Sequence, residues 1–532
     1  MNVRKYLAAY LPYRRFAKDY AWMRTCLSPQ QGKAVLMVNF TDWAPRTKLD
    51  GVIAKGLQLR GYRPFILTKR AYTWSHAYFR AIGITDLLFF DDYLKEAAST
   101  LSPEETSGLL ETNLSFQKLY SYHEGEIGIG RHVLSSVVRQ LKSGSVSFED
   151  PDAIRLLREF FPLSRKSARA AELVFKELAP SIVLFSEKGY TPYGEIFDTA
   201  LSHWCNTVQY LHAHRSDLLL LKRYTLASRF QHHFSLSRES WKKVQETPWR
   251  AEEEERFLDT LKKSYAEGTW FNRKFLLEGK KLKDPETVRR ELRLDPTRKT
   301  AVIFSHVLWD ATFFFGENLF PDYEQWLIAT VREACKNTSV NWLIKLHPDY
   351  VWKMREMRGP SASPRDALAL EAELGPLPSH IQIVPPDTDI STYSFFAITD
   401  YCITVRGTIG IEAPCFGIPV ITAGTGRYSN LGFTNDSKTA EEYLAKIRGI
   451  QGIPPLTKEE TTLARKHAYG LFELRPLPFT TCELLQNTVR GNFGQDAVIR
   501  AHSLDDLRSA SDLQALLDFV LESREEDYLR SS

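Results

Sequence analysis

Residues 404–424, TVRGTIGIEAPCFGIPVITAG, bring several chemically useful residue types into one short connection between two predicted strands. Arg406 supplies a cation, Gly407 lets a ligand approach the backbone closely, and Thr408 supplies a hydroxyl. Free backbone N–H groups at a helix start suit a phosphate, and Glu412 could bind the two hydroxyls of a ribose. The connection therefore predicts a nucleotide site. Without a ligand, Thr408 could be the N-cap of a helix and Glu412 could interact favourably with the positive end of the same helix.

Other polar residues in the same half of the chain stand at predicted strand ends or in one polar loop. These candidates are Ser305, His306, Lys345, His347, Ser391 and Tyr393. A proline follows His347 and ends its strand, so His347 would lie at the carboxyl edge of a sheet and could donate a hydrogen bond to a phosphate. A partly buried histidine that satisfies the loop backbone is the alternative. Ser391 could instead cap the helix that follows it.

The spacing of apolar runs predicts an α/β fold. Short apolar runs alternate with helix-like stretches, as in parallel sheets covered by helices. The predicted strands lie in residues 33–40, 63–68, 86–94, 182–185, 207–217, 295–306, 340–350, 381–384, 400–405 and 419–424. A charged helical stretch at residues 241–291 separates two such sets. We therefore expect two doubly wound, Rossmann-like domains that face each other across a cleft, with ligands at the carboxyl ends of the strands.

The length of 532 residues also favours more than one domain, because single hydrophobic cores rarely exceed about 250–300 residues. We expect a basic aromatic N-terminal segment, an N-terminal α/β domain with a helical insertion, a C-terminal α/β domain and a C-terminal helical segment. Their expected bounds are residues 1–30, 31–285 with the insertion at about 97–170, 286–465 and 466–532.

Composition excludes several classes of protein. The net charge of +4, from 69 basic and 65 acidic residues, is too balanced for a nucleic-acid-binding surface. The six cysteines form no CxxC pair, so neither a disulfide framework nor a zinc site is expected. The chain lacks an apolar run of about 18 residues and an apolar signal core at its N-terminus. A cytoplasmic protein without a metal or other cofactor is therefore expected.

The first 24 residues differ from the rest because basic and aromatic side chains alternate there. Such a segment could lie on an anionic membrane surface. A helix docked on its own domain is the equally weighted alternative. Pro12 is expected to break any single long helix in this segment.

Three segments together resemble bacterial capsule and surface-polysaccharide glycosyltransferases, a group that includes transferases of 3-deoxy-manno-octulosonate (Kdo). They are IKLHPD at residues 344–349, the stretch at 389–424, and GRYSNLGFT at 426–434. The resemblance covers roughly residues 306–446 and implies the two-domain GT-B fold. It further implies phosphate contact for His347, nucleotide contact for Gly407 and Thr408, and ribose contact for Glu412. Arg406 departs from the small or polar residue expected before that glycine, which leaves the nucleotide open.

Transfer of a sugar would also require a carboxylate from the N-terminal domain, as a base or as a nucleophile. Glu187 fits best because it directly follows a predicted strand, and Asp42, in the loop after the first strand, is second. A surface or capping carboxylate is the alternative for each. His214 and Arg215, at another strand end, are expected to contact the acceptor. Lys345, His347, Arg406 and a helix start could stabilise the leaving phosphate without a metal.

The leading hypothesis is a glycosyltransferase that moves a sugar from a nucleotide-sugar donor to a bacterial glycan, with a lipid-linked or glycan acceptor. The first alternative is a sugar-nucleotide epimerase or hydrolase of the same fold. The second is a non-catalytic, transferase-like scaffold in polysaccharide assembly.

Overall fold

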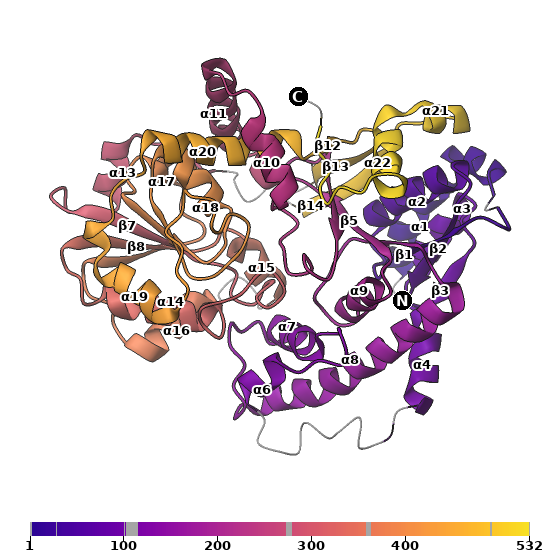
Figure 1. Ribbon diagram of the computed structural model, residues 1–532, viewed down its shortest axis with the longest axis horizontal. Helices are drawn as coiled ribbons and strands as arrows, with labels where there is room; N and C mark the ends of the chain where they lie inside the picture. Colours follow the sequence, from indigo (N-terminus) through magenta and orange to yellow (C-terminus); the bar gives the residue numbers. More distant parts are fainter. Residues whose placement is uncertain are drawn as a thin grey trace.

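Two α/β lobes form the molecule (Figure 1), each built on its own sheet. The computed structural model describes residues 3–27, 29–100, 102, 115–272, 279–357, 363–489 and 492–530. The expected α/β class with two doubly wound, Rossmann-like domains is confirmed by the two sheets, in which most neighbouring strands are parallel.

The N-terminal sheet has seven strands in the order β12-β6-β5-β4-β1-β2-β3. Its strands are β1 (Ala34–Val38), β2 (Arg63–Thr68), β3 (Leu87–Phe89), β4 (Ile182–Phe185), β5 (Asn206–His212), β6 (Leu218–Tyr224) and β12 (Leu477–Pro478). The strands β1 to β5 are parallel, whereas β6 pairs antiparallel with both β5 and β12. The flanking helices include α2 (Ala44–Leu59), α3 (Thr73–Ala81), α4 (Phe90–Thr100) and α9 (Tyr193–Ser202). Strand β6 was not expected from the sequence, although its apolar LLLLKRY run follows β5 after a short turn, as in a β-hairpin.

The C-terminal sheet has five parallel strands in the order β11-β10-β7-β8-β9. They are β7 (Lys299–Phe304), β8 (Val340–Lys345), β9 (Ile381–Val384), β10 (Tyr401–Thr404) and β11 (Val420–Thr422). Around them lie α14 (Tyr323–Ala334), α15 (Tyr350–Met357), α16 (Arg365–Leu374), α17 (Thr392–Phe396), α18 (Ile409–Glu412), α19 (Ala440–Arg448) and α20 (Lys458–Tyr469). The expected helical link between the lobes contains α10 (Arg238–Glu246), α11 (Ala251–Ala266), η2 (Trp270–Asn272) and α13 (Pro285–Glu291).

A helical insertion of the N-terminal lobe packs directly on the C-terminal lobe. It comprises α6 (Phe116–Tyr120), α7 (Ile129–Leu141) and α8 (Pro151–Leu178). Buried side chains of α7, such as Val133 and Val137, belong to the same hydrophobic cluster as Trp326 and Leu327 of α14. The Arg131 guanidinium also binds Glu317 at 3.0 Å across this contact. The two lobes are therefore joined by a common core as well as by the chain.

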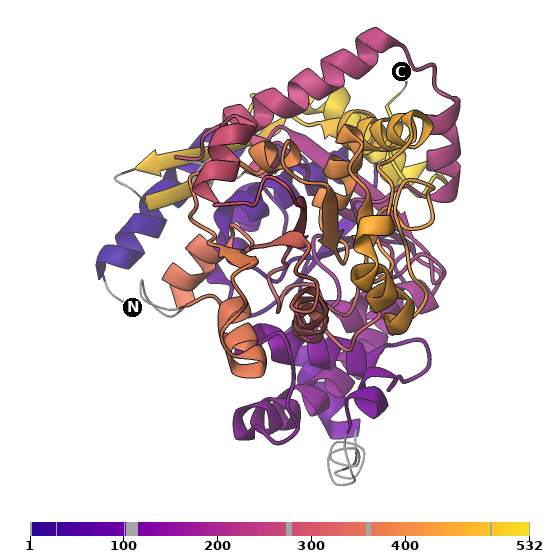
Figure 2. The same ribbon diagram turned by 90° about the vertical axis from the view of Figure 1, so that its left-hand side faces the viewer.

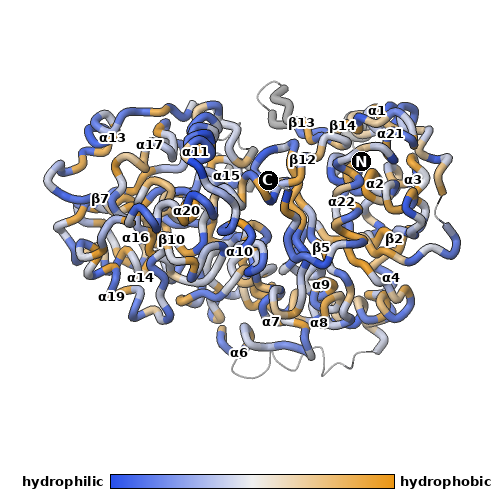
Figure 3. Tube along the Cα trace, turned by 45° about the horizontal axis from the view of Figure 1, so that its top comes forward, coloured by the Kyte–Doolittle hydropathy of each residue, from blue (hydrophilic) through white to orange (hydrophobic). Residues whose placement is uncertain are grey.

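The C-terminal segment, expected to be helical, is only partly so and returns to the N-terminal lobe. Besides β12 it contains an antiparallel pair, β13 (Cys482–Val489) and β14 (Asn492–Ile499), followed by α21 (Leu504–Ser509) and α22 (Ser511–Leu521). Figure 3 shows these elements beside α1 and α2. Leu513 and Leu517 of α22 share a core with Leu49 and Val52 of α2.

The N-terminal helix α1 (Val3–Asp19) runs through Pro12, so the expectation that this proline breaks the helix is wrong. Pro12 is exposed, and the half of the helix that follows it is held by packing: Phe16 is buried against Tyr78, and the Tyr20 hydroxyl donates to the Ile499 carbonyl at 3.0 Å. In Figure 2 the indigo helix lies beside the yellow β13–β14 pair. Among the described helices, none is long and apolar enough to cross a membrane.

Candidate functional site

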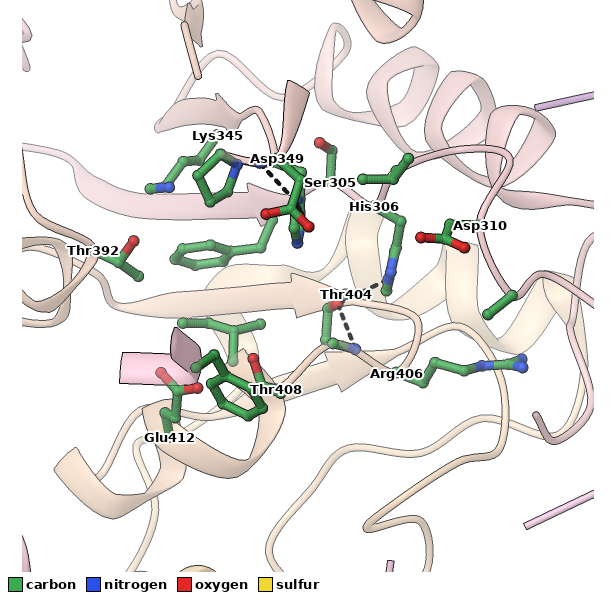
Figure 4. A pocket seen from close by; sticks show the side chains of 18 of the residues that line it. Ser305, His306, Asp310, Lys345, Asp349, Thr392, Thr404, Arg406, Thr408 and Glu412 are labelled. Atoms are coloured by element: carbon green, nitrogen blue, oxygen red, sulfur yellow. Dashed lines mark hydrogen bonds and ion pairs between the residues drawn. The ribbon is translucent and has the colours of Figure 1, made fainter. Parts of the chain in front are cut away.

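The polar strand ends of the C-terminal lobe meet at one edge of its sheet. Strand β7 lies between β10 and β8 in parallel register, with Val302 opposite both Cys402 and Leu343. The residues that follow these three strands therefore converge (Figure 4), and they line a cavity of about 250 Å³. This volume is below the roughly 300–1,000 Å³ of typical ligand sites.

Eight of the predicted donor-side residues line this cavity. They are Ser305, His306, Lys345, His347, Arg406, Gly407, Thr408 and Glu412. Ser391 and Tyr393, which were also predicted, do not line the cavity, although Thr392 between them does. Ser391 is buried at the N-cap of α17, and Tyr393 packs on Phe396 and Tyr265.

The turn after β10 is shaped by its glycines. Gly410 has no room for a side chain, because an added Cβ would lie 2.1 Å from the Tyr428 hydroxyl. That hydroxyl donates to the Gly407 carbonyl at 2.9 Å. The Gly407 N–H donates to the Thr404 hydroxyl at 3.3 Å. Thr408 makes no capping hydrogen bond, so its hydroxyl is not used in the N-cap role that was the alternative explanation.

Glu412 is buried at the base of the cavity and binds the link between the lobes. It accepts hydrogen bonds from the Tyr265 hydroxyl and, at 3.3 Å, from the Trp270 indole N–H. The aromatic rings of Tyr265, Trp270 and Phe271 line the cavity beside it. Each carboxylate oxygen can accept more than one hydrogen bond, so the position remains compatible with the ribose contact that the sequence predicts.

His306 is fixed by contacts on its edge and its face. Its Nε2 accepts from the Val405 N–H and contacts the Thr404 hydroxyl, each at 3.2 Å, while the ring stacks on Tyr323 with centroids 4.5 Å apart. Burial, followed by the electrostatic effects of His347 and Arg406, holds the pKa of His306 well below its ordinary value. This imidazole is therefore neutral at physiological pH.

Arg427 is a cavity residue that the sequence interpretation missed, although it lies within one of the three quoted segments. Burial lowers the pKa of Arg427 to about 10. Its Nη2 contacts His232 Nε2 at 2.9 Å. Nothing in a lone Arg-Tyr pair indicates a site. His232 lines the cavity as well.

Glu187 lies at the carboxyl end of β4, as predicted, but beside the cavity rather than in its wall. Burial raises the pKa of Glu187 to about 7. The hydrogen bond from the Lys188 N–H and the positive charge of Arg139 lower the pKa, but their effect is smaller. Asp310 of the opposite lobe is within electrostatic reach and does line the cavity. Its Oδ2 pairs with Lys353 Nζ at 2.6 Å.

Tyr190 connects the Glu187 loop to the cavity wall. Its hydroxyl donates to Asp310 Oδ1 at 3.1 Å and accepts from the Ala311 N–H at 2.9 Å. Ala311 has φ +56, a conformation that non-glycine residues rarely adopt. Phe314 packs edge-on against Tyr190, and an added Cβ at Gly189 would lie 2.1 Å from the Phe314 ring. The two lobes thus meet closely at this loop.

The remaining predicted residues lie outside the cavity. Asp42 accepts from the Ser75 N–H at 2.7 Å near the start of α3. His214 is buried beneath the Trp270 ring, and burial lowers its pKa to about 3. Arg215 pairs with Asp217 at 2.7 Å near the surface. Within the described chain, no three His, Cys, Asp or Glu residues are grouped as metal ligands would be.

Comparison with known proteins gives no family. No family model matches the chain, and no curated protein matches it. Among solved structures, KpsC of Thermosulfurimonas dismutans, a β-Kdo 2,4-transferase, is 14% identical over 62% of this chain and 87% of that chain, with a TM-score of 0.32. The UDP-GlcNAc 2-epimerase of Neisseria meningitidis is 11% identical over 82% and 96%, with a TM-score of 0.27. The calicheamicin glycosyltransferase CalG4 is 14% identical over 83% and 94%, also with a TM-score of 0.27. Likenesses this distant do not bear on activity.

Proposed function

We propose that the chain is a glycosyltransferase that moves a sugar from a nucleotide-sugar donor to a growing bacterial surface glycan of capsule or lipopolysaccharide type. The observation that carries the proposal is the convergence of Lys345, His347 and Arg406 with the Gly407–Thr408 turn and Glu412 in one cavity. Cations and backbone amides bind phosphate, and a buried carboxylate can bind ribose hydroxyls.

In the proposed reaction the bond between the sugar's anomeric carbon and the phosphate oxygen breaks, and its electron pair stays on the phosphate. The cations of the cavity stabilise the charge that develops there, which requires no metal ion. An acceptor hydroxyl attacks the anomeric carbon, and Glu187 takes up its proton. A carboxyl group with a pKa of about 7 is suited to that role because it is a stronger base than an ordinary glutamate.

The acceptor is proposed to be a glycan or a lipid-linked glycan at the inner face of the cytoplasmic membrane. Helix α1 supports this, since Arg14, Arg15 and Lys18 are exposed on it together with Leu11 and Pro12. Exposed cations beside apolar side chains favour an anionic lipid surface.

A transfer assay tests the proposed activity. The purified protein is incubated with labelled CMP-, UDP- and GDP-sugars, with and without lipid-linked glycan acceptors, and the products are separated by chromatography. Acceptor-dependent loss of label from one donor is expected. A new sugar isomer formed without acceptor would identify an epimerase instead, and release of free sugar would identify a hydrolase.

A scaffold would behave differently in cells. Replacement of Glu187, Asp42 and His347 together would leave the glycan intact if the protein only assembles other enzymes. The proposed transferase predicts that this triple replacement abolishes the glycan as completely as deletion of the gene does.

A further inference from the structure

The polar and charged residues of the cavity lie toward two sides. Figure 4 shows Lys345, Thr392 and Glu412 on one side and Asp310 and Arg406 on the other. We call the first side the nucleotide end. Gly426 packs against the Arg406 side chain, with 2.8 Å between its would-be Cβ and Arg406 Cβ, so Arg427 follows directly beside Arg406. We call Arg406 and Arg427 together the arginine pair.

The arginine pair has cationic donors without acceptors. Arg406 is 3% exposed, and its Nη2 donates to the Glu317 carbonyl at 3.1 Å and to the Asn318 amide oxygen. The Nε and Nη1 atoms of Arg406 and of Arg427 are buried without a hydrogen-bond partner. Among the described ion pairs, none within 4.0 Å joins either arginine to a carboxylate. A buried, unpaired charge is costly, and a bound anion would remove that cost.

Arg427 shares the His232 ring with a second hydrogen-bond donor. The Phe234 N–H donates to His232 Nδ1 at 2.9 Å, and Arg427 Nη2 lies 2.9 Å from Nε2 of the same ring. Burial, and then the charge of Arg427, holds the pKa of His232 well below its ordinary value, so the ring is neutral and carries one proton. A neutral imidazole accepts at one nitrogen only, and therefore one of these two donors faces another donor.

A purely structural role explains one nitrogen of each arginine. Arg406 Nη2 ties the cavity to residues 317–318, and Arg427 Nη2 reaches His232. The four remaining buried nitrogens have no hydrogen-bond partner in the described chain, although each guanidinium group also lies over an aromatic ring, Tyr323 for Arg406 and Phe234 for Arg427. Asp310, a carboxylate of the cavity wall, is already paired with Lys353 at 2.6 Å.

On the basis of the proposed function, we propose that the arginine pair is a second anion subsite, so that the donor carries two negatively charged groups. The first is the phosphate next to the nucleoside, bound at the nucleotide end. The second is bound by Arg406 and Arg427, whose planar guanidinium groups suit bidentate oxyanions. Two donor types supply a second anion: a nucleoside diphosphate sugar, through its second phosphate, or a CMP-linked acidic sugar, through its carboxylate.

Isothermal titration with matched ligands tests the subsite. UMP is compared with UDP, CMP with CDP, GMP with GDP, and CMP with a CMP-linked ulosonic acid. The preferred ligand with two anionic groups is expected to bind at least about tenfold more tightly than its counterpart with one anionic group. A gain for a diphosphate identifies the phosphate source, and a gain for the CMP-linked acid identifies the carboxylate source.

The variant Arg427→Gln is expected to lose this gain while it still binds the nucleoside monophosphate, which shows that the variant is folded. Arg427→Lys should recover only part of the gain, because an ammonium group cannot bind two oxygens in a plane. Arg332→Gln, which removes an exposed guanidinium on α14, is the control and should keep the full gain. Equal binding of matched ligands, or a gain that survives in Arg427→Gln, would overturn the second subsite alone. Absence of any nucleotide binding would overturn the proposed function itself.

Discussion

Among individual side chains, Glu187 has the environment that best fits a proton acceptor. It follows a buried strand of the N-terminal lobe and lies within electrostatic reach of Arg139, Lys188 and Asp310. The sequence predicts that Glu187 places a carboxylate just after a strand. The raised pKa cannot be predicted in this way, because it arises from burial in the folded chain and, to a smaller extent, from the charge of Asp310, which is distant in the sequence.

Replacement of Glu187 by Gln is therefore expected to lower kcat by about 10²–10⁴-fold, the usual contribution of a general base. Nucleotide affinity should stay within about threefold, since Glu187 does not line the cavity. Steady-state kinetics and titration calorimetry measure the two effects. The control is Glu159→Gln, which removes an exposed carboxylate of the same lobe. Unchanged kcat in Glu187→Gln would exclude this residue as the base.

The pH dependence of kcat follows from the same pKa. A base with a pKa raised to about 7 is protonated and inactive below that pH and ionised above it. The kcat of the wild-type protein should thus rise with pH up to about 7 and then level off. Measurement of kcat between pH 5 and 9 tests this rise. A rise centred near pH 4 to 5 would show that a carboxylate with an ordinary pKa acts as the base instead.

At the scale of elements, the site depends on strand order as much as on residue type. The sequence predicts β2, β4 and β9 with their observed bounds, because each is a short apolar run between turn residues. It also predicts Lys345, His347 and Thr408 as polar residues after strands. The sequence does not predict that β7 lies between β8 and β10. It therefore does not predict that His306 lies between the nucleotide end and the arginine pair. Strand order depends on long-range packing rather than on local pattern.

The loop that carries Glu187 is expected to act through Tyr190. In Tyr190→Phe, Asp310 Oδ1 loses a donor and the Ala311 N–H loses an acceptor, and Ala311 is already in an unfavourable conformation. We expect kcat to fall at least about tenfold, because misplacement of the loop by even about 1 Å is costly to catalysis. The dissociation constant of the nucleotide should change less than about threefold.

Kinetics and calorimetry on the same preparations separate those two quantities for Tyr190→Phe. Tyr122→Phe is the comparison, because it removes a hydroxyl that bonds to Glu124 in the insertion, away from the cavity. If both variants retained full kcat, the loop would not depend on the contact between Tyr190 and Asp310.

For the whole molecule, the two lobes are held together by contacts that the sequence does not reveal. The insertion shares a core with α14, and the C-terminal tail returns to the first sheet. Asp527, near the end of the chain, is buried between Lys222 and Arg475, with Oδ1 at 2.9 Å and 3.2 Å from their nitrogens. Lys222 precedes Asp527 by 305 residues and Arg475 precedes it by about 50, so a local pattern could not indicate the pairing.

Replacement of Asp527 by Asn is expected to destabilise the N-terminal lobe by about 3–5 kcal/mol, because two buried cations lose their counter-charge. The comparison is Asp518→Asn, which breaks an exposed pair with Arg60 and should cost about 1 kcal/mol or less. Urea unfolding followed by circular dichroism measures both. Equal midpoints for the two variants would contradict the structural role of the buried cluster.

The same cluster predicts behaviour in acid. Although burial opposes its ionisation, the charges of Arg475 and Lys222 hold the pKa of Asp527 at about 2. A lowered native pKa stabilises the fold above the unfolded pKa of 3.8, and that contribution disappears as the pH falls toward 2. The difference in unfolding free energy between wild type and Asp527→Asn should therefore shrink between pH 4 and 2. A difference that stays constant over this range would show that Asp527 does not act through its charge.

The most direct test of the central claim is a crystal structure of the protein grown with the nucleotide that binds most tightly in calorimetry. We expect electron density for a phosphate beside Lys345 and His347 at the Gly407–Thr408 turn, with the ribose toward Glu412. A nucleotide bound elsewhere on the molecule, while this cavity holds only solvent, would contradict it.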